Sequence, residues 1–236
     1  MDEIFLTENI VIKDNNTYYQ DKLVKRHNWH IKLEELGWQK LNKHWIKKLN
    51  ILDNPYPNNS LYGAIDCGDD GDCLFHCISY ALNTNFVEIY DSSDIRELVA
   101  KSVTNDQFDN IISCYRSMDD LNDFDESWNP WEIDTIDKFK DELCKTGHSY
   151  WGDHLILQLI MVTFDINILI LTQNELLNLY EPYFTTSAYN KHKRTIILIH
   201  ENDIHFKLLG HFNGTVITYF YHDKLPLAIK LMFKLN

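Results

Sequence analysis

Residues 66–82 read DCGDDGDCLFHCISYAL, and this stretch governs how the rest of the sequence is interpreted. A loop rich in Gly and Asp runs directly into an apolar helical pattern, and Cys73 stands at the junction. Amide groups at a helix start and the positive end of the helix dipole stabilise a thiolate there. The helix would be anchored in a core by Leu74, Cys77, Ile78, Ala81 and Leu82. Cys73 is therefore a candidate nucleophile, and a buried structural thiol is the alternative.

Composition and charge narrow the class of protein. The 236 residues suffice for one large domain or a domain with an appendage. The start of the chain lacks a basic and apolar leader, and we expect no membrane span. Five cysteines, an odd number, argue against a disulfide framework and favour a cytoplasmic, reducing location. The net charge of −13 argues against nucleic acid and favours a cationic partner. We expect a monomer.

The N-terminal region predicts an extension to the main domain. Residues 4–12 alternate weakly and fit either a strand or a loosely docked arm. Residues 18–49 predict two helices that break near Gly37. The segment 53–60 reads DNPYPNNS and is the clearest loop signal in the chain. We therefore expect a helical N-terminal extension over 1–54 and a catalytic domain over 55–236.

The remaining helices come before most of the strands. Helices are predicted to start within Asp91-Ser92-Ser93-Asp94, where Asp94 with Glu97 fits a capping arrangement, and near Thr104, with Gln107 three residues on. A deeply buried helix is expected over 153–164.

Strands dominate the C-terminal third. They are expected at 166–171, 195–199 and 204–209, and Asn213-Gly214 predicts a type I′ hairpin with a return strand at 215–221. The fold class is thus α/β (α+β), a small and mostly antiparallel sheet packed between helical regions.

A cysteine nucleophile needs a base, and histidine suits this role because its pKa lies near neutrality. The chain has eleven histidines. His205 lies just past a predicted tight turn, at the start of a strand, where it can project toward the thiol helix. His200 and His211 are the alternatives on position alone.

Residues 70–75, DGDCLF, resemble the Asp-Gly-Asn-Cys-Leu-Phe signature of the ovarian tumour (OTU) family of cysteine deubiquitinases. Residues 150–158, YWGDHLILQ, look like the family's Trp-Gly-Gly block, and residues 204–206, IHF, look like its His-aromatic block. Residues 94–99, DIRELV, are similar to the helix with Leu-Arg that follows the nucleophile. The resemblance covers roughly residues 62–221.

The resemblance implies a papain-type fold and a ubiquitin-directed cysteine isopeptidase. Cys73 would attack the carbonyl of the ubiquitin C-terminal glycine in its bond to lysine, with His205 as general base and then acid. Asp70 would join this catalytic group, and the backbone of Asp70, Gly71 and Cys73 would form the oxyanion hole. The family implies no cofactor and no metal. The close set Cys67, Cys73, His76 and Cys77 also lacks the spacing of a zinc module.

Two positions depart from the family pattern. Asp72 replaces the usual asparagine, and its carboxylate would oppose the thiolate unless it points to solvent. Lys207 stands where many members place an Asp or Asn that orients the histidine, and lysine cannot accept that hydrogen bond. The candidates for this acid are Asp66, Asn202, Asp203 and Asp223, the last because a two-residue hairpin at 213–214 would bring it near position 205.

Partners and rival functions follow from the same reading. We expect ubiquitin or polyubiquitin chains as partners, with other ubiquitin-like modifiers as an option. The alternatives are a catalytically dead ubiquitin-binding module and an OTU-like protease acting on a polyprotein or another modifier. The composition, rich in Asn, Ile and Lys with few Gly and Pro, suits an AT-rich genome such as that of a large DNA virus or an intracellular microbe, which would act in the host cytoplasm.

Overall fold

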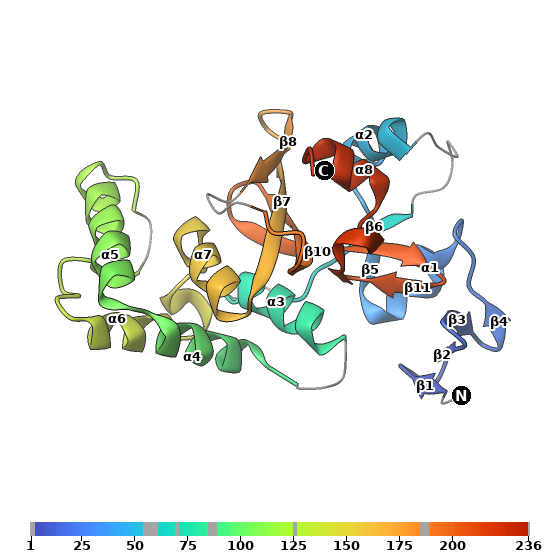
Figure 1. The fold of residues 1–236 in the computed structure, drawn as a ribbon, viewed down its shortest axis with the longest axis horizontal. Helices are drawn as coiled ribbons and strands as arrows, with labels where there is room; N and C mark the ends of the chain where they lie inside the picture. Colours follow the sequence, from blue (N-terminus) through green and yellow to red (C-terminus); the bar gives the residue numbers. More distant parts are fainter. Residues whose placement is uncertain are drawn as a thin grey trace.

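The computed structural model describes residues 3–53, 61–68, 71–84, 89–124, 127–184 and 189–235. Within them the chain forms a central sheet with helices on both faces, a helical arm at one end and a small ribbon at the other (Figure 1). No helix in these ranges is long and apolar enough to cross a membrane.

The N-terminal ribbon is an antiparallel sheet of β1 (Ile4–Phe5), β2 (Ile10–Lys13), β3 (Asn16–Tyr19) and β4 (Lys22–Leu23). Its turns use Asp14-Asn15 and Gln20-Asp21, all with positive φ, which is the geometry of tight two-residue hairpins. The strand alternative for residues 4–12 is confirmed by β1 and β2, whereas the helix expected from residue 18 is wrong for residues 18–23, which lie in β3, its turn and β4. Gln20-Asp21 is a local turn signal that outweighs the helical spacing there.

The rest of the extension is shared between helix and strand. It contains α1 (Trp29–Lys32), a 3₁₀ turn η1 (Glu34–Leu36), β5 (Trp38–Lys40) and α2 (Lys43–Asp53). Strand β5 pairs with β6 and so belongs to the main sheet. The division of the chain near residue 54 stays a prediction, since residues 54–60 lie outside the described ranges.

The main sheet of the described residues runs in the order β5-β6-β10-β9-β7-β8, and two short strands, β11 and β12, attach to β10 and β9. Among the described strands every pair is antiparallel except β7 with β9, which agrees with the mostly antiparallel sheet that was expected. The strands after β5 are β6 (Tyr62–Ile65), β7 (Ile166–Asn174), β8 (Leu179–Phe184), β9 (Arg194–Glu201), β10 (His205–Asn213), β11 (Thr215–Ile217) and β12 (Tyr219–Phe220).

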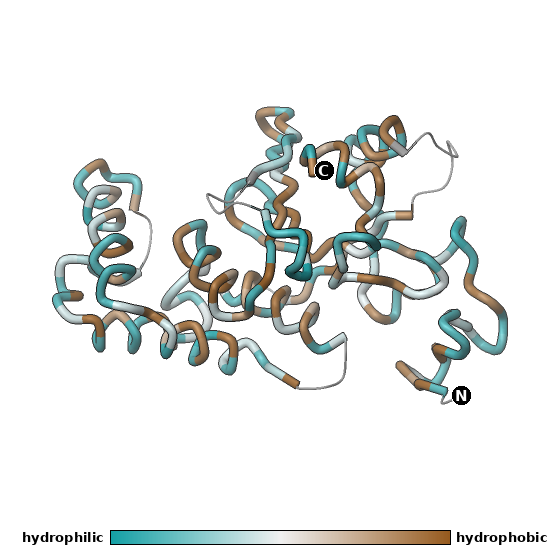
Figure 2. The backbone as a smooth tube through the Cα atoms, in the orientation of Figure 1, coloured by the Kyte–Doolittle hydropathy of each residue, from teal (hydrophilic) through white to brown (hydrophobic). Residues whose placement is uncertain are grey.

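Alternate residues of the central strands face two separate cores. In β9, Ile196 and Leu198 join the core under α3 and α7, whereas Ile197 and Ile199 join the core under α2 and α8. This period of two is what a strand covered on both faces requires. Figure 2 shows hydrophobic residues concentrated along α7 and the central strands, while α4 and α5 alternate between hydrophobic and hydrophilic residues.

The helices were predicted well in kind and less well in their starting residues. They are α3 (Cys73–Asn83), α4 (Ser92–Ser102), α5 (Asn105–Asp120), α6 (Ile136–Leu143), α7 (His154–Thr163) and α8 (Leu227–Met232), with 3₁₀ turns η2 (Gly147–Ser149) and η3 (His222–Lys224). The predicted cap of α5 by Thr104 with Gln107 is confirmed. Helix α4 starts within the predicted segment 91–94, but the predicted capping pair is wrong, because Asp91 is the N-cap and Asp94, not Glu97, closes the capping box.

The expected two-residue hairpin at Asn213-Gly214 is wrong. Asn213 pairs directly with Thr215, which leaves Gly214 alone in the turn at φ +87°. The return strand follows β10 only to Ile217 and then crosses to β9. The register argument that placed Asp223 near His205 therefore fails.

Candidate active site

Cys73 is the first residue of α3 and is held there by packing. Its side chain is 6% exposed, and the backbone N–H of Phe206 donates to its sulfur at 3.4 Å. The following residues Leu74 and Phe75 are fully buried, and Gly152 fits against them because any Cβ at 152 would lie 2.7 Å from Leu74. The thiol thus sits at the positive end of a helix whose position is fixed by its own core face.

His205 begins β10, beside this thiol, and its other partner is Asp66. Asp66 follows β6, the strand that pairs with β10, so the two residues come from neighbouring strands. The Nε2 atom of His205 lies 3.0 Å from both carboxylate oxygens of Asp66. The imidazole is about a quarter exposed. Of the four candidates for the histidine's partner, the structure brings Asp66 into contact.

The electrostatic setting favours a charged imidazole. The hydrogen bond to the Cys73 thiol and the neighbouring charges of Cys73 and Asp66 raise the pKa of His205 to about 8, although burial opposes this. Since Nε2 faces Asp66, Nδ1 is the nitrogen left for the thiol. A thiol and an imidazole in this setting form the pair that a cysteine nucleophile needs.

The other three candidates have different partners. Asn202 accepts from the Glu175 backbone, and Asp203 accepts from Asn174 at 3.0 Å. Asp223 sits on η3 with Lys224 as its neighbour at 3.7 Å. Lys207, which occupies the usual place of the orienting acid, pairs with Glu201 across the β9–β10 ladder at 2.6 Å.

The loop before the nucleophile is described only in part. Gly71 has φ of +84°, and a Cβ there would lie 2.2 Å from the carbonyl oxygen of Gly147, so a residue without a side chain is required. Asp70, expected in the catalytic group and the oxyanion hole, lies outside the described residues. Its role stays a prediction.

Asp72 does not point to solvent, which corrects the expectation for this departure from the family. Its side chain is buried and accepts from Nε of Arg96 at 2.8 Å and from Nη2 of the same guanidinium. Its second oxygen accepts from the backbone N–H of Gly147 at 2.9 Å. The carboxylate beside the thiol is thus neutralised by a buried cation.

Arg96 is fully buried and its hydrogen bonds cross three segments. Besides Asp72 it donates to the carbonyls of Leu143 at 3.1 Å and Tyr150 at 2.8 Å, and its guanidinium lies over the Phe75 ring at 3.8 Å. Burial lowers the pKa of Arg96 while Asp72 opposes that effect. The sequence analysis included Arg96 only as part of the motif at residues 94–99. The signal that could have revealed its partner is Asp72, an acid at a loop position where the OTU family usually has asparagine.

Comparisons with known proteins agree with this geometry. A family model described as OTU-like cysteine protease matches residues 68–212, more than half of the chain. The chain belongs to the OTU-like cysteine protease family. No curated protein sequence matches it.

Solved structures of OTU proteins resemble this chain at low identity. An OTU deubiquitinase from Wolbachia pipientis wMel is 17% identical, with 68% of this chain and 94% of that chain covered and a TM-score of 0.45. A structure of an OTU domain in complex with ubiquitin is 19% identical, covering 74% and 88%, with a TM-score of 0.41. The Hazara virus OTU bound to ubiquitin is 15% identical, covering 64% and 82%, with a TM-score of 0.38.

A groove of about 500 Å³ in this OTU-like protease is lined by Ile204 and Phe206, the residues on either side of His205. It is walled by Trp151 and Gly152, by the residues flanking His205, and by the end of α5 with Asp123. His200 forms part of its floor and stacks on Phe206 at 4.3 Å. Burial, together with nearby His154, lowers the pKa of His200 to about 4, so this ring is neutral near pH 7.

Proposed function

We propose that this OTU-like protease is a ubiquitin-directed isopeptidase, which hydrolyses the bond after the C-terminal glycine of ubiquitin. The observation that carries the proposal is the joint placement of Cys73, His205 and Asp66, with the thiol at a helix start and the imidazole held between thiol and carboxylate. Family membership supports a cysteine protease. The choice of ubiquitin rests on the motifs shared with the deubiquitinases and on the groove described above.

The reaction would proceed through a thioester. The Cys73 thiolate attacks the glycine carbonyl, and the imidazolium of His205 donates its proton to the leaving lysine amine. Water then attacks the thioester as His205 takes up a proton, which releases the ubiquitin carboxylate and restores the thiol. Asp66 keeps Nε2 engaged, so that Nδ1 stays directed at sulfur and the imidazolium is stabilised.

Backbone amides would stabilise the oxyanion. The first amides of α3 have no partner within the helix, and Asp72, the N-cap, uses its side chain for Arg96 instead of capping them. The amide of Cys73 and those of the preceding loop are therefore the natural donors for a developing negative charge. The positive φ of Gly71 supports the sharp turn that this arrangement needs.

The groove beside Trp151 suits the tail of ubiquitin, which is extended, apolar and basic. Asp123 and Asp203 supply negative charge at its walls, and Phe124 and Ile204 supply apolar contact. The acidic character of the whole chain acts in the same direction, because it attracts a basic partner at long range.

A ubiquitin probe with a thiol-reactive group at its C-terminus tests the proposal. We expect wild type to form a covalent adduct and Cys73→Ala to form none, whereas Cys77→Ala, which removes the buried cysteine one turn later, should still react. Adducts are read by a mass shift of the intact protein.

Three other results would contradict the proposal. Tight binding of the probe without capture by wild type would identify a dead ubiquitin-binding module. Capture of a probe built on another ubiquitin-like modifier, with none on ubiquitin, would assign a different substrate. Adducts that persist in Cys73→Ala would place the nucleophile elsewhere.

A further inference from the structure

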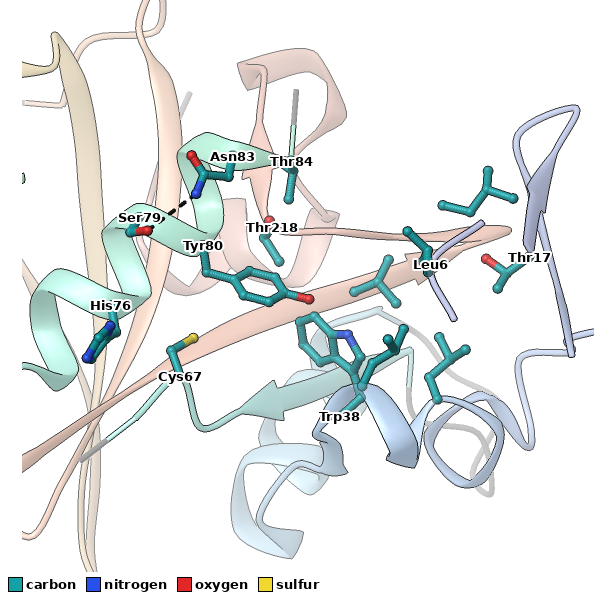
Figure 3. Close-up of a pocket in the computed structure, with 14 residues that line it drawn as sticks. Leu6, Thr17, Trp38, Cys67, His76, Ser79, Tyr80, Asn83, Thr84 and Thr218 are labelled. Atoms are coloured by element: carbon teal, nitrogen blue, oxygen red, sulfur yellow. Dashed lines mark hydrogen bonds between the residues drawn. The ribbon is translucent and has the colours of Figure 1, made fainter. Parts of the chain in front are cut away.

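A second cavity, of about 470 Å³, lies between the N-terminal ribbon and α3 (Figure 3). Figure 3 shows Cys67 and His76 at one end, Leu6 and Thr17 of the ribbon at the other, and Tyr80 with Trp38 between them. The cavity is therefore bounded by the nucleophile helix on one side and by the extension on the other.

One end of this cavity adjoins the reactive pair. Cys67 directly follows Asp66, which contacts His205, and His76 lies one turn along α3 from Cys73. The loop closes tightly on the helix at this point, because a Cβ at Gly68 would lie 2.9 Å from the His76 ring. This end of the cavity is therefore one residue in sequence from Asp66 and one helical turn from Cys73.

The far wall is docked in place. The backbone N–H of Thr17 donates to the carbonyl of Gly214 at 2.9 Å, which ties the ribbon to the β10–β11 turn. Ile10 and Val24 of the ribbon are buried in the same core as α3. The ribbon is therefore a fixed wall, and not the loosely docked arm that the sequence left open.

The chemistry of the walls sets the kind of occupant. No Lys, Arg, Asp or Glu lines the cavity among the described residues, and its surface is made chiefly by Leu6, Leu36, Trp38, Tyr80 and Val216. Burial raises the pKa of Tyr80 to about 12, so its hydroxyl stays neutral. An apolar side chain fits such a surface, and a charged one would lose its hydration there.

The two cavities are lined by different neighbours of Cys73 and His205: the groove by Ile204 and Phe206, on either side of His205, and the second cavity by Cys67 and by His76, one turn from Cys73. An isopeptidase has an acyl side, which takes the ubiquitin tail, and a leaving side, which carries the acceptor lysine. The carboxylates of Asp123 and Asp203 make the groove complementary in charge to the basic ubiquitin tail, so the groove suits the acyl side. The second cavity, which no Lys, Arg, Asp or Glu lines among the described residues, then remains for the leaving side. We propose that this cavity is an acceptor-side subsite, filled by an apolar side chain of the protein that bears the modified lysine. This assignment rests on the proposed function.

Two variants that fill the cavity from opposite walls provide the test. Leu6→Trp acts from the ribbon and Thr84→Trp from the end of α3; both sites are at least partly exposed, which favours folding. Leu23→Trp, on the exposed edge of the same ribbon and outside the cavity, is the matched control. Each is assayed on ubiquitin with a small C-terminal fluorophore and on diubiquitins of all eight linkages, after its melting temperature has been checked.

The fluorophore substrate has no acceptor protein, so we expect both filling variants to cleave it at the wild-type rate. On the preferred diubiquitin we expect kcat/KM to fall about 10-fold or more, the usual size of an apolar pocket effect. Filling variants that match wild type on every linkage, or lose equally on both substrates, would overturn the subsite and leave the proposed function standing. A folded wild type that cleaves neither substrate would overturn the proposed function and the subsite together.

Discussion

Asp66 and Asp72 both lie in the stretch before Cys73, and the protein holds their carboxylates in opposite ways. Asp66 is about two-fifths exposed and faces an imidazole that titrates near neutrality. Asp72 is buried and faces Arg96, a cation that stays charged at every accessible pH and is itself fully buried. The first arrangement allows a proton to move, whereas the second fixes the loop, α4 and the segment before Trp151 relative to one another. Asp66 thus acts on the imidazole beside the thiol, whereas Asp72 fixes the structure around it.

The largest expected effect comes from breaking the buried pair. Arg96→Met should lower the free energy of unfolding by about 3–5 kcal/mol, because it leaves a buried carboxylate without a counter-charge. Urea unfolding followed by circular dichroism measures this. Lys101→Met is the control on the same helix, since its pair with Glu97 is exposed and should contribute less than about 1 kcal/mol. Equal losses in the two variants would contradict the comparison.

Breaking the exposed pair should affect the rate and spare the fold. Asp66→Ala should reduce kcat/KM on a ubiquitin fluorophore substrate about 100-fold, because the imidazole loses its orientation and its stabilising charge. Its free energy of unfolding should change by about 1 kcal/mol or less. Asp223→Ala, at another position that the sequence had offered, should keep wild-type activity. A fully active Asp66→Ala would remove Asp66 from the site.

Substitutions in the buried Asp72–Arg96 pair can make the charge beside the Cys73 thiol either more negative or more positive. Arg96→Met leaves an uncompensated anion next to Cys73, and Asp72→Asn leaves an uncompensated cation. At one fixed pH we expect the rate of iodoacetamide alkylation of Cys73 to shift downward in the first variant and upward in the second, because a nearby anion disfavours a thiolate and a nearby cation favours it. A purely structural pair would slow the reaction in both variants without these opposite shifts.

The smallest expected effect is a shift in the pH dependence of activity, caused by a change at the exposed Asp66–His205 pair. The pKa of His205 is raised from 6.5 to about 8, most strongly by its hydrogen bond to the Cys73 thiol and to a smaller extent by Asp66. Activity should therefore decline as pH rises through about 8, because the imidazolium that protonates the leaving amine is lost. In Asp66→Asn this alkaline limb should move to lower pH by less than about one unit. The stability that Asp66 contributes is present below pH 6.5 and is lost as pH rises to about 8, so melting temperatures of the two proteins should converge over that window. A limb that stays in place would show that Asp66 does not act on His205.

Local signals predicted the nucleophile side of this site and failed for the long-range partners. Cys73 and Gly71 follow from a loop that becomes a helix within a few residues. Asp66 was only one of four candidates, because its contact with His205 depends on β6 lying beside β10. The Asp72–Arg96 pair was missed for a similar reason, since it joins a loop to a helix that starts after an intervening segment.

The N-terminal extension shows a different failure. Apolar and aromatic spacing there suggested helices, yet the turns at Asp14-Asn15 and Gln20-Asp21 set a hairpin ribbon. Turn residues with positive φ decide the path of a short segment more strongly than a weak period does. The tryptophans of this region, Trp29, Trp38 and Trp45, are buried in the core.

Asp66 and His205 lie 139 residues apart in the chain, and they meet only when β10 takes its place between β6 and β9. At ribosomal rates of about 5–20 residues per second, the nucleophile emerges on the order of ten seconds before its base. A nascent chain therefore carries a thiol with no imidazole beside it and a strand β6 that awaits its partner. In the proposed mechanism activity requires β10, so the onset of cleavage during synthesis would report that β10 has paired with β6 and β9.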